Sequence, residues 1–370
     1  MKKTDLTYLF YLPSFSGGGS EMVTINLANQ FYSNKKKIIF LCSNNNGPLF
    51  FKLNKNIKVI NLKKKRLLFS IFKIIEVIKK EKPNVIFSSL VHSNIFFCII
   101  KKYINIKFFL LIRHGNIANI DSNLKNKIKH YLFSILIKIF YKYSDILVSS
   151  GNLTKIYLNS VLGLKKQIVS LNNPVFTRQD FIRQINTKNK WVQKNKYNYI
   201  LSIGRLSFQK NYIFLIKSFI NLKLSKKNKL LIIGEGDQYN FLKKFIKQKN
   251  LADKIKIIKF QKNPLKYIYF CKCFVLSSLW EGQSNVLLQA ALLKKKIICA
   301  DTAGDVKYLN KKFRNINIYK SNNYNDFKKK IISTLNYNHK DSKNKFHKCS
   351  KDFDIKAITK KYIRIIDEKI

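Results

Sequence analysis

Short apolar runs alternate along this chain with longer segments of helical periodicity, and this alternation constrains the fold more than any other sequence feature. Short runs without polar interruption are typical of strands that are buried on both faces. In the first part of the chain we expect strands at 6–12, 37–42, 85–88, 108–112 and 146–149, and helices at 20–32, 67–80, 93–102 and 124–143. Because parallel strands need a crossover connection, usually a helix, the alternation predicts a doubly wound parallel sheet of the α/β class.

A second series of the same kind follows a polar stretch at 178–196. There we expect strands at 199–203, 229–233, 255–258, 274–276 and 297–300, and helices at 212–222, 239–249 and 284–293. A polar stretch that follows Asn173-Pro174 is typical of a domain boundary. The sequence therefore predicts two Rossmann-like domains, 1–175 and 176–350. A Lys- and Asn-rich segment at 320–350 shows no pattern, and a last amphipathic helix is expected at 355–366.

The chain is strongly basic, with 72 Lys and Arg against 19 Asp and Glu and a formal net charge of +53. Such a balance attracts polyanions, including nucleic acids and acidic lipids. Only seven of the basic residues are Arg, however, and residues with A/T-rich codons are abundant throughout. We favour compositional drift over a polyanionic partner and expect no specific nucleic-acid binding. Hydrophobic residues make up 46% of the chain, which excludes a wholly disordered protein.

The sequence gives no sign of a metal site, a disulfide framework or a membrane span. The six cysteines lie mostly within apolar runs and lack the paired spacing of zinc ligands, which fits a reducing compartment. The longest apolar stretches, 85–100 and 131–148, are interrupted by His, Asn or Lys. The apolar run near the N-terminus follows Asp5, is short and lacks a small-residue cleavage site. These observations predict a cytoplasmic protein without a transmembrane segment.

Ligands of open parallel sheets bind at the carboxyl ends of the strands, so the turns after the predicted strands are the candidate sites. The turn after 6–12 has three glycines before a predicted helix, in the sequence Gly17-Gly18-Gly19-Ser20-Glu21. Such a turn lets a ligand approach the backbone, and the free N–H groups of the helix start attract anions. A flexible turn without a ligand is the alternative. His114, just after 108–112, is either a ligand contact or an ordinary turn residue.

Three turns of the second domain carry further candidates. Arg205 and Lys210 follow the strand at 199–203, and together they can clamp a pyrophosphate. The strand at 229–233 ends in a glycine-rich turn with Gly234 and Gly236. The strand at 274–276 is followed by Glu281-Gly282-Gln283-Ser284-Asn285, with Gln289 two turns further on. Ser284 is suited to cap a helix whose N–H groups would bind phosphate.

The order and spacing of these motifs resemble glycosyltransferase family 4, whose members have the two-domain GT-B fold. The shared motifs are Gly18-Gly19-Ser20-Glu21, Gly204-Arg205-Leu206 with Lys210, Gly234-Glu235-Gly236, Glu281 with Gln289, Asn173-Pro174-Val175, and Thr302-Ala303-Gly304-Asp305. The resemblance spans nearly the whole chain. It departs at position 289, where the family usually has a Glu that contacts ribose hydroxyls. Gln keeps one acceptor and loses the charge, so donor binding could weaken or the nucleotide could differ.

The resemblance implies that 1–175 binds an acceptor, that 176–350 binds a nucleotide-sugar across a shared cleft, and that 351–370 packs back on the first domain. The implied catalytic residues are His114, Arg205, Lys210 and Glu281, with Arg205 and Lys210 on the diphosphate. The remaining donor contacts would be Gly18, Gly19, Gly204, Gly234, Gly236, Gly282, Gln283, Ser284, Asn285 and Gln289. The donor would be a UDP-sugar, and the transferred sugar would be an N-acetylhexosamine or a hexose. No other cofactor and no metal would be needed. Asp352-Phe353-Asp354 resembles a metal-binding Asp-x-Asp motif, but it lies at the start of the last helix.

The expected activity is that of a retaining hexosyltransferase of bacterial surface glycan biosynthesis, acting on a lipid-linked or polysaccharide acceptor. Two basic amphipathic segments, Lys63–Arg66 with the helix after it and 125–143, suit peripheral binding to an anionic membrane. Sheet-covering helices with solvated lysines are the alternative. A catalytically inactive GT-B paralogue that binds polyanions or membranes is the rival function. A GT-B sugar-nucleotide epimerase fits the spacing around Arg205 and Glu281 less well.

Overall fold

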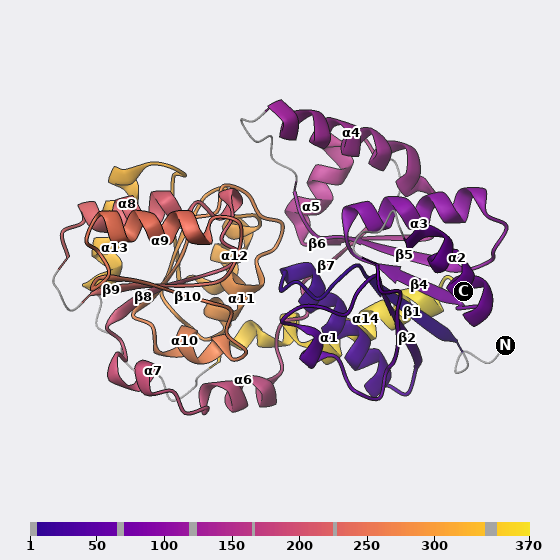
Figure 1. Cartoon of the computed structure of the whole chain (residues 1–370), viewed down its shortest axis with the longest axis horizontal. Coiled ribbons are helices and arrows are strands. Elements are labelled where there is room, and N and C mark those ends of the chain that lie inside the picture. The colour runs from indigo at the N-terminus through magenta and orange to yellow at the C-terminus, as the bar shows by residue number, and fades with distance from the viewer. Residues whose placement is uncertain (1–5, 65–69, 118–123, 165–166, 225–227, 337–345) are drawn as a thin grey trace. The chain divides into compact units, whose positions relative to one another are not determined.

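The computed structural model describes residues 6–64, 70–117, 124–164, 167–224, 228–336 and 346–370 (Figure 1). The chain divides into two compact units. Unit 1 comprises Met1–Pro174 with Phe353–Ile370, and unit 2 comprises Val175–Asp352. Each unit contains one parallel β-sheet covered by helices, so the predicted α/β fold with two Rossmann-like domains is confirmed. Which unit binds a donor and which an acceptor stays a prediction.

The sheet of unit 1 has seven parallel strands in the order β3-β2-β1-β4-β5-β6-β7. Their bounds are β1 Thr7–Leu12, β2 Lys37–Cys42, β3 Lys58–Asn61, β4 Val85–Ser88, β5 Phe109–His114, β6 Ile146–Ser150 and β7 Ile168–Leu171. The helices of this unit are α1 Gly19–Ser33, α2 Ile71–Glu81, α3 Val91–Tyr103, α4 Leu124–Phe140, α5 Asn152–Ile156 and α14 Ile355–Asp367. The strand order reverses between β1 and β4, which is the point where ligands of such sheets bind.

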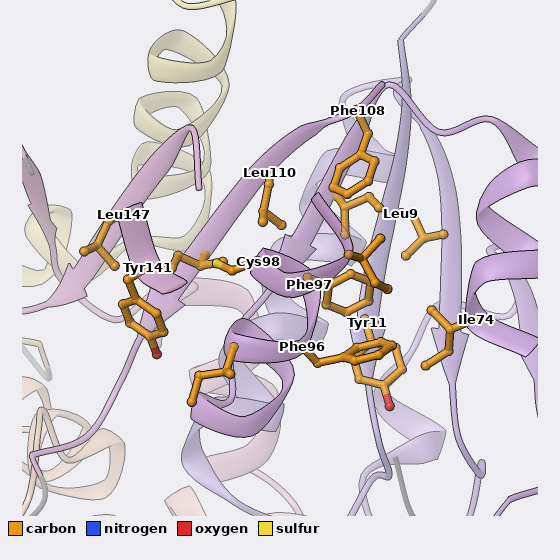
Figure 2. Close-up of a cluster of buried hydrophobic side chains, with 14 of the residues drawn as sticks. Leu9, Tyr11, Ile74, Phe96, Phe97, Cys98, Phe108, Leu110, Tyr141 and Leu147 are labelled. Atoms are coloured by element: carbon orange, nitrogen blue, oxygen red, sulfur yellow. The ribbon is translucent and has the colours of Figure 1, made fainter. Parts of the chain in front are cut away.

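Alternate residues of the unit 1 strands pack on opposite faces of the sheet, as the period of a strand requires. On one face, Leu9 and Tyr11 join an apolar cluster with side chains of α2 and α3 (Figure 2). On the other face, Tyr8 packs edge-on against Phe31 of α1, with ring centroids 5.2 Å apart. Phe87 meets Tyr362 of α14 there at 5.8 Å. The last helix of the chain therefore forms part of the core of unit 1.

The sheet of unit 2 has six parallel strands in the order β10-β9-β8-β11-β12-β13. Their bounds are β8 Tyr199–Ile203, β9 Lys229–Ile233, β10 Ile255–Ile258, β11 Cys273–Leu276, β12 Ile297–Ala300 and β13 Ile316–Tyr319. The helices are α6 Arg178–Ile185, α7 Lys190–Lys194, α8 Tyr212–Asn221, α9 Tyr239–Gln248, α10 Pro264–Phe270, α11 Asn285–Leu292, α12 Val306–Phe313 and α13 Tyr324–Leu335. One core lies between the sheet and α8, α9 and α13. The order reverses between β8 and β11, so unit 2 also has a switch point.

Two segments that the sequence analysis treated as irregular are partly helical. The polar stretch 178–196 contains α6 and α7, which bury the apolar residues Phe181, Ile185 and Val192. The pattern-free segment 320–350 contains α13, which buries Phe327 and Ile331. In both cases a narrow apolar stripe suffices to hold a helix against the sheet or its neighbours, although most of its residues are polar.

Candidate functional site

In unit 1 the glycine-rich turn joins β1 to α1, and the side chain of Glu21 lies close against Gly18. Gly18 is the N-cap of α1 and has no side chain to cap the helix. The carboxylate of Glu21 folds back over it, so a Cβ at Gly18 would lie 2.2 Å from Glu21 Oε2. Ser16 Oγ donates a hydrogen bond of 2.9 Å to the same carboxylate. A buried carboxylate thus lies at the N-terminus of α1, beside the predicted ligand contacts Gly18 and Gly19.

His114 is the last residue of β5, at the carboxyl edge of the same sheet. The turn after it touches the start of α1, because a Cβ at Gly115 would lie 2.9 Å from Ser20 Oγ. The imidazole is 2% exposed, and its Nδ1 lies 3.1 Å from the hydroxyl of Tyr141. Burial lowers the pKa of His114 to about 4, although a hydrogen bond with the backbone of Asn116 acts in the opposite direction. The ring is therefore neutral at physiological pH.

Arg113, the neighbour of His114 on β5, is a buried cation that links three parts of unit 1. Its guanidinium is 1% exposed and donates to the side-chain oxygen of Asn173. Burial lowers the pKa of Arg113, and Tyr362 of α14 opposes that effect. Arg113 therefore ties the end of β5 to the Asn173-Pro174 segment and to the last helix.

In unit 2 the turns after β8 and β9 lie against each other, because these strands are neighbours in the sheet. The backbone of Leu206 donates to the Glu235 carbonyl at 2.8 Å. A Cβ at Gly234 would lie 1.9 Å from the Gly204 carbonyl oxygen, so only glycine fits at position 234. At Gly236, with φ +159°, a Cβ would lie 2.3 Å from the Leu206 carbonyl oxygen. The structure therefore brings the predicted residues Gly204, Gly234 and Gly236 together.

The turns after β8 and β11 are joined by an ion pair between Lys210 Nζ and Glu281 Oε1. Ser278 Oγ donates to the same Glu281 oxygen at 2.9 Å. The two charged side chains are only 14% and 12% exposed, so water screens their attraction less than it would at the surface. Ser277 Oγ donates to the Lys210 carbonyl at 2.8 Å and fixes the backbone of that turn. Two of the four predicted catalytic residues are thus in direct contact, whereas Arg205 is exposed on the same turn after β8.

The remaining predicted donor contacts surround the start of α11. Gly282, Gln283 and Ser284 are buried, while Asn285 and Gln289 are half-buried. Ser284 occupies the N-cap position, but its hydroxyl makes no capping bond, contrary to the expected cap. The turn after β12 packs on this segment, since a Cβ at Gly304 would lie 1.8 Å from the Gly282 carbonyl oxygen. Gly304 also has φ +72°, which favours glycine.

Two residues that were assigned no role from the sequence support this site. Thr302 Oγ1 donates to the Ser278 carbonyl at 2.9 Å and links the turns after β12 and β11. The hydroxyl of Tyr212 borders Gly204, where a Cβ would lie 3.0 Å away. Burial raises the pKa of Tyr212, and the charge of Glu281 adds to this effect. The signals available were the shared motif that begins at Thr302, after a predicted strand, and the position of Tyr212 at the start of a predicted helix.

Three further observations concern the described part of the chain only. No group of three or more His, Cys, Asp or Glu side chains is placed there to hold a metal ion. No described helix is both long and apolar enough to cross a bilayer. A cavity of about 710 Å³ lies at the amino ends of β1, β4, β5 and β6, the edge of the sheet opposite to the predicted site. Its lining mixes apolar residues with the Lys101–Asp145 ion pair.

Comparison with known proteins gives matches to glycosyltransferases. Residues 183–352 match the model of the family described as Glycosyl transferases group 1. The chain is 29% identical over 281 residues to an uncharacterized glycosyltransferase of Methanocaldococcus jannaschii, covering 72% of this chain and 64% of that protein. It is 32% identical over 185 residues to an N-acetylgalactosamine-N,N'-diacetylbacillosaminyl-diphospho-undecaprenol 4-alpha-N-acetylgalactosaminyltransferase of Campylobacter jejuni, covering 48% of this chain and 47% of that protein. The chain thus spans about half to two thirds of the length of these two relatives.

A second Campylobacter jejuni protein, a GalNAc-alpha-(1->4)-GalNAc-alpha-(1->3)-diNAcBac-PP-undecaprenol alpha-1,4-N-acetyl-D-galactosaminyltransferase, is 26% identical over 97% of this chain and 98% of its own length. Among solved structures, a glycosyltransferase from Rickettsia africae is similar with a TM-score of 0.74 and 18% identity over 98% of both chains. The Anabaena protein Alr3699/HepE, solved with UDP and glucose, is similar with a TM-score of 0.74 and 14% identity over 98% of this chain and 99% of its own. The finer assignment to family 4 stays a prediction. Residues 183–352 match the group 1 glycosyl transferases, and the chain as a whole has the two-domain GT-B fold.

Proposed function

We propose that this protein is a retaining glycosyltransferase that moves a sugar from a UDP-sugar to a lipid-linked glycan during bacterial surface glycan synthesis. The observation that carries the proposal is the meeting of Lys210 and Glu281 at converging strand ends within the part of the chain that matches the family. When the bond between the sugar and the nucleotide breaks, negative charge grows on the departing diphosphate. Arg205, Lys210 and the N–H groups at the start of α11 would stabilise that charge without a metal ion.

The names of the relatives guide the choice of substrates. Two of them are named as N-acetylgalactosaminyltransferases that act on undecaprenol-linked sugars, which supports an N-acetylhexosamine donor and a polyprenol-diphosphate-linked acceptor. Crystals of Alr3699/HepE with UDP support UDP as the nucleotide. Glu281 would contact the transferred sugar, and Gln289 would contact the ribose through one acceptor oxygen where the family usually offers a carboxylate.

We also propose that unit 1 binds an anionic membrane surface through α4. Five large apolar residues of α4 are exposed, at 36 to 68%: Ile128, Tyr131, Leu132, Ile135 and Ile139. Their spacing of three and four residues places them on one face of the helix. Lys138 and Lys142 are exposed beside them, and 124–143 contains no acidic residue. Of the other predicted segment, Lys65, Arg66 and 67–69 lie outside the described residues.

The activity is tested first by donor binding, with saturation-transfer NMR of the purified chain against UDP-, GDP- and ADP-sugars. We expect UDP-N-acetylhexosamines to bind and Arg205→Ala to lose at least tenfold in affinity, because the guanidinium fork would hold the diphosphate. Arg183→Ala is the matched control, since Arg183 is an exposed arginine of the same unit on α6. Absence of binding by any nucleotide-sugar would reject the transferase and favour the inactive paralogue that binds polyanions or membranes.

A further inference from the structure

A chain of buried hydrogen bonds leads from α3 to the imidazole of His114. Asn94 Nδ2 lies 3.0 Å from the carbonyl oxygen of Arg113 and 3.3 Å from the hydroxyl of Tyr141. The Tyr141 hydroxyl lies 3.1 Å from His114 Nδ1. Asn94 is fully buried, and the ring of Tyr141 is embedded in the apolar cluster of unit 1 (Figure 2). Water therefore does not compete for these bonds.

The direction of every hydrogen bond in this series follows from the group at its far end, the carbonyl of Arg113. A carbonyl oxygen only accepts, so the group of Asn94 that faces the Arg113 carbonyl is the NH₂ group. The second N–H of that group then donates to the Tyr141 oxygen. The hydroxyl of Tyr141 still has its own proton to donate, and among the described residues His114 Nδ1 is the acceptor within reach. The hydroxyl therefore donates to Nδ1, and Nδ1 carries no proton.

We propose that Asn94 and Tyr141 are positioning residues that hold His114 as the neutral tautomer with its proton on Nε2. The imidazole then offers one N–H donor and no free acceptor, which suits it to bind an oxygen of a substrate without charging or accepting a proton. Its Nε2–H would donate to that oxygen when the substrate binds. Burial and the positive charge of Arg113 both lower the pKa of His114, in agreement with a ring that stays neutral. Tyr157 also packs beside the imidazole, with ring centroids 6.3 Å apart.

The catalytic part of this proposal depends on the proposed function, but the tautomer can be measured without it. The chain has only five histidines, so ¹⁵N-histidine labelling of the full protein gives few signals in long-range ¹H–¹⁵N correlation spectra. The His114 signal is assigned by its loss in His114→Gln. At pH 7.5 we expect the coupling pattern of a neutral ring with a protonated Nε2. A proton on Nδ1, or a charged ring, would overturn the proposal.

Two matched variants test the role of the tyrosine. Tyr141→Phe keeps the ring and removes the hydroxyl, so we expect the averaged signals of a tautomer mixture. Tyr157→Phe removes a hydroxyl that bonds Ser134 instead, and it should leave the His114 signals as in the wild type. An unchanged spectrum in Tyr141→Phe would contradict the positioning role. If that variant does not fold, the wild-type tautomer decides alone.

Turnover separates the two proposals. Once a sugar donor is identified, Tyr141→Phe should lower kcat about tenfold and leave the KM for that sugar donor within a factor of two. The reason is that the substitution disturbs the hydrogen-bond donor His114 and leaves the binding turns of unit 2 unchanged. Absence of turnover in the wild-type protein would reject the proposed function but would not affect the result on the His114 tautomer. A protonated Nε2 combined with an unchanged kcat in Tyr141→Phe would reject the positioning role alone.

Discussion

The buried imidazole of His114 makes the stability of unit 1 depend on pH. Its pKa is lowered from 6.5 to about 4 in the folded chain. Between these two values the unfolded chain binds a proton that the folded chain does not, so stability is lost as the pH falls from 6.5 towards 4. The loss is on the order of 3 kcal/mol at most, since one pKa unit corresponds to about 1.4 kcal/mol. His114→Gln should remove this part of the pH dependence.

The measurement is the urea midpoint of unfolding at pH 7.5, 6.0 and 5.0. His92→Gln is the matched control, because His92 is exposed on α3 and its loss should leave the pH slope as in the wild type. Carboxylates also titrate in this range, so the difference between the slopes of the two variants is the quantity that matters. Equal slopes would show that His114 is not buried as a neutral ring.

At the scale of residues, positions at strand ends could be predicted from the sequence, but contacts between distant residues could not. The strand-and-turn pattern placed Arg205, Lys210 and Glu281 at strand ends, because their neighbours have the spacing of buried strands. It could not pair Lys210 with Glu281, which lie 71 residues apart, or His114 with Tyr141, which lie 27 apart. Such pairs depend on how helices and turns pack in three dimensions, and the local pattern carries no information on that.

At the scale of elements, the interior strands were predicted, whereas of the edge strands only β10 was. Strands β8 and β9 lie at the predicted residues because every position, or nearly every one, is apolar and buried. The missed strands β3, β7 and β13 each lie at the edge of a sheet, and β3 and β13 contain an Asn. An edge strand has a neighbour on one side only, so polar residues are tolerated there and the apolar signal weakens. The helices α6 and α13 were missed because most of their residues are polar.

The last helix offers a prediction at this scale. The interpretation of Asp352-Phe353-Asp354 as a helix start is confirmed, because Asp354 caps α14 by accepting a hydrogen bond of 2.9 Å from the backbone of Ala357. Asp354→Ala should destabilise this helix by about 1 kcal/mol, equivalent to roughly fivefold faster hydrogen exchange of the amides of its first turns. Thr177→Ala is the control, since Thr177 is the N-cap of α6 and makes no capping bond. Equal effects of the two substitutions on their helices would argue against the cap.

At the scale of the whole molecule, the net charge of +53 and the apolar face of α4 make separable contributions to membrane binding. Replacing Leu132 and Ile139 by Glu should reduce binding to vesicles that contain phosphatidylglycerol by at least about tenfold, because it removes inserted apolar area and adds repulsive charge. Sedimentation with vesicles at 50 and 500 mM NaCl measures both contributions. The expected wild-type result is binding that weakens with salt, since the lysines are screened.

Phe241→Glu is the control for this prediction, because Phe241 is 54% exposed on α9 of unit 2. It should bind vesicles almost as the wild type does. Equal losses in the control and the α4 variant would attribute binding to overall charge, and undiminished binding of the α4 variant would exclude α4 as the contact.

The return of the chain to unit 1 has a consequence for how the protein is made. Tyr362 of α14 fills part of the core beside Phe87, yet it leaves the ribosome only after all of unit 2. At ~5–20 residues per second, roughly 180 intervening residues take on the order of 10–35 s to synthesise. During that time unit 1 has an open apolar groove where α14 will lie, whereas unit 2 is one continuous stretch and can fold as soon as it emerges. The half made first is therefore completed last, and in that interval its exposed groove is a natural target for chaperones.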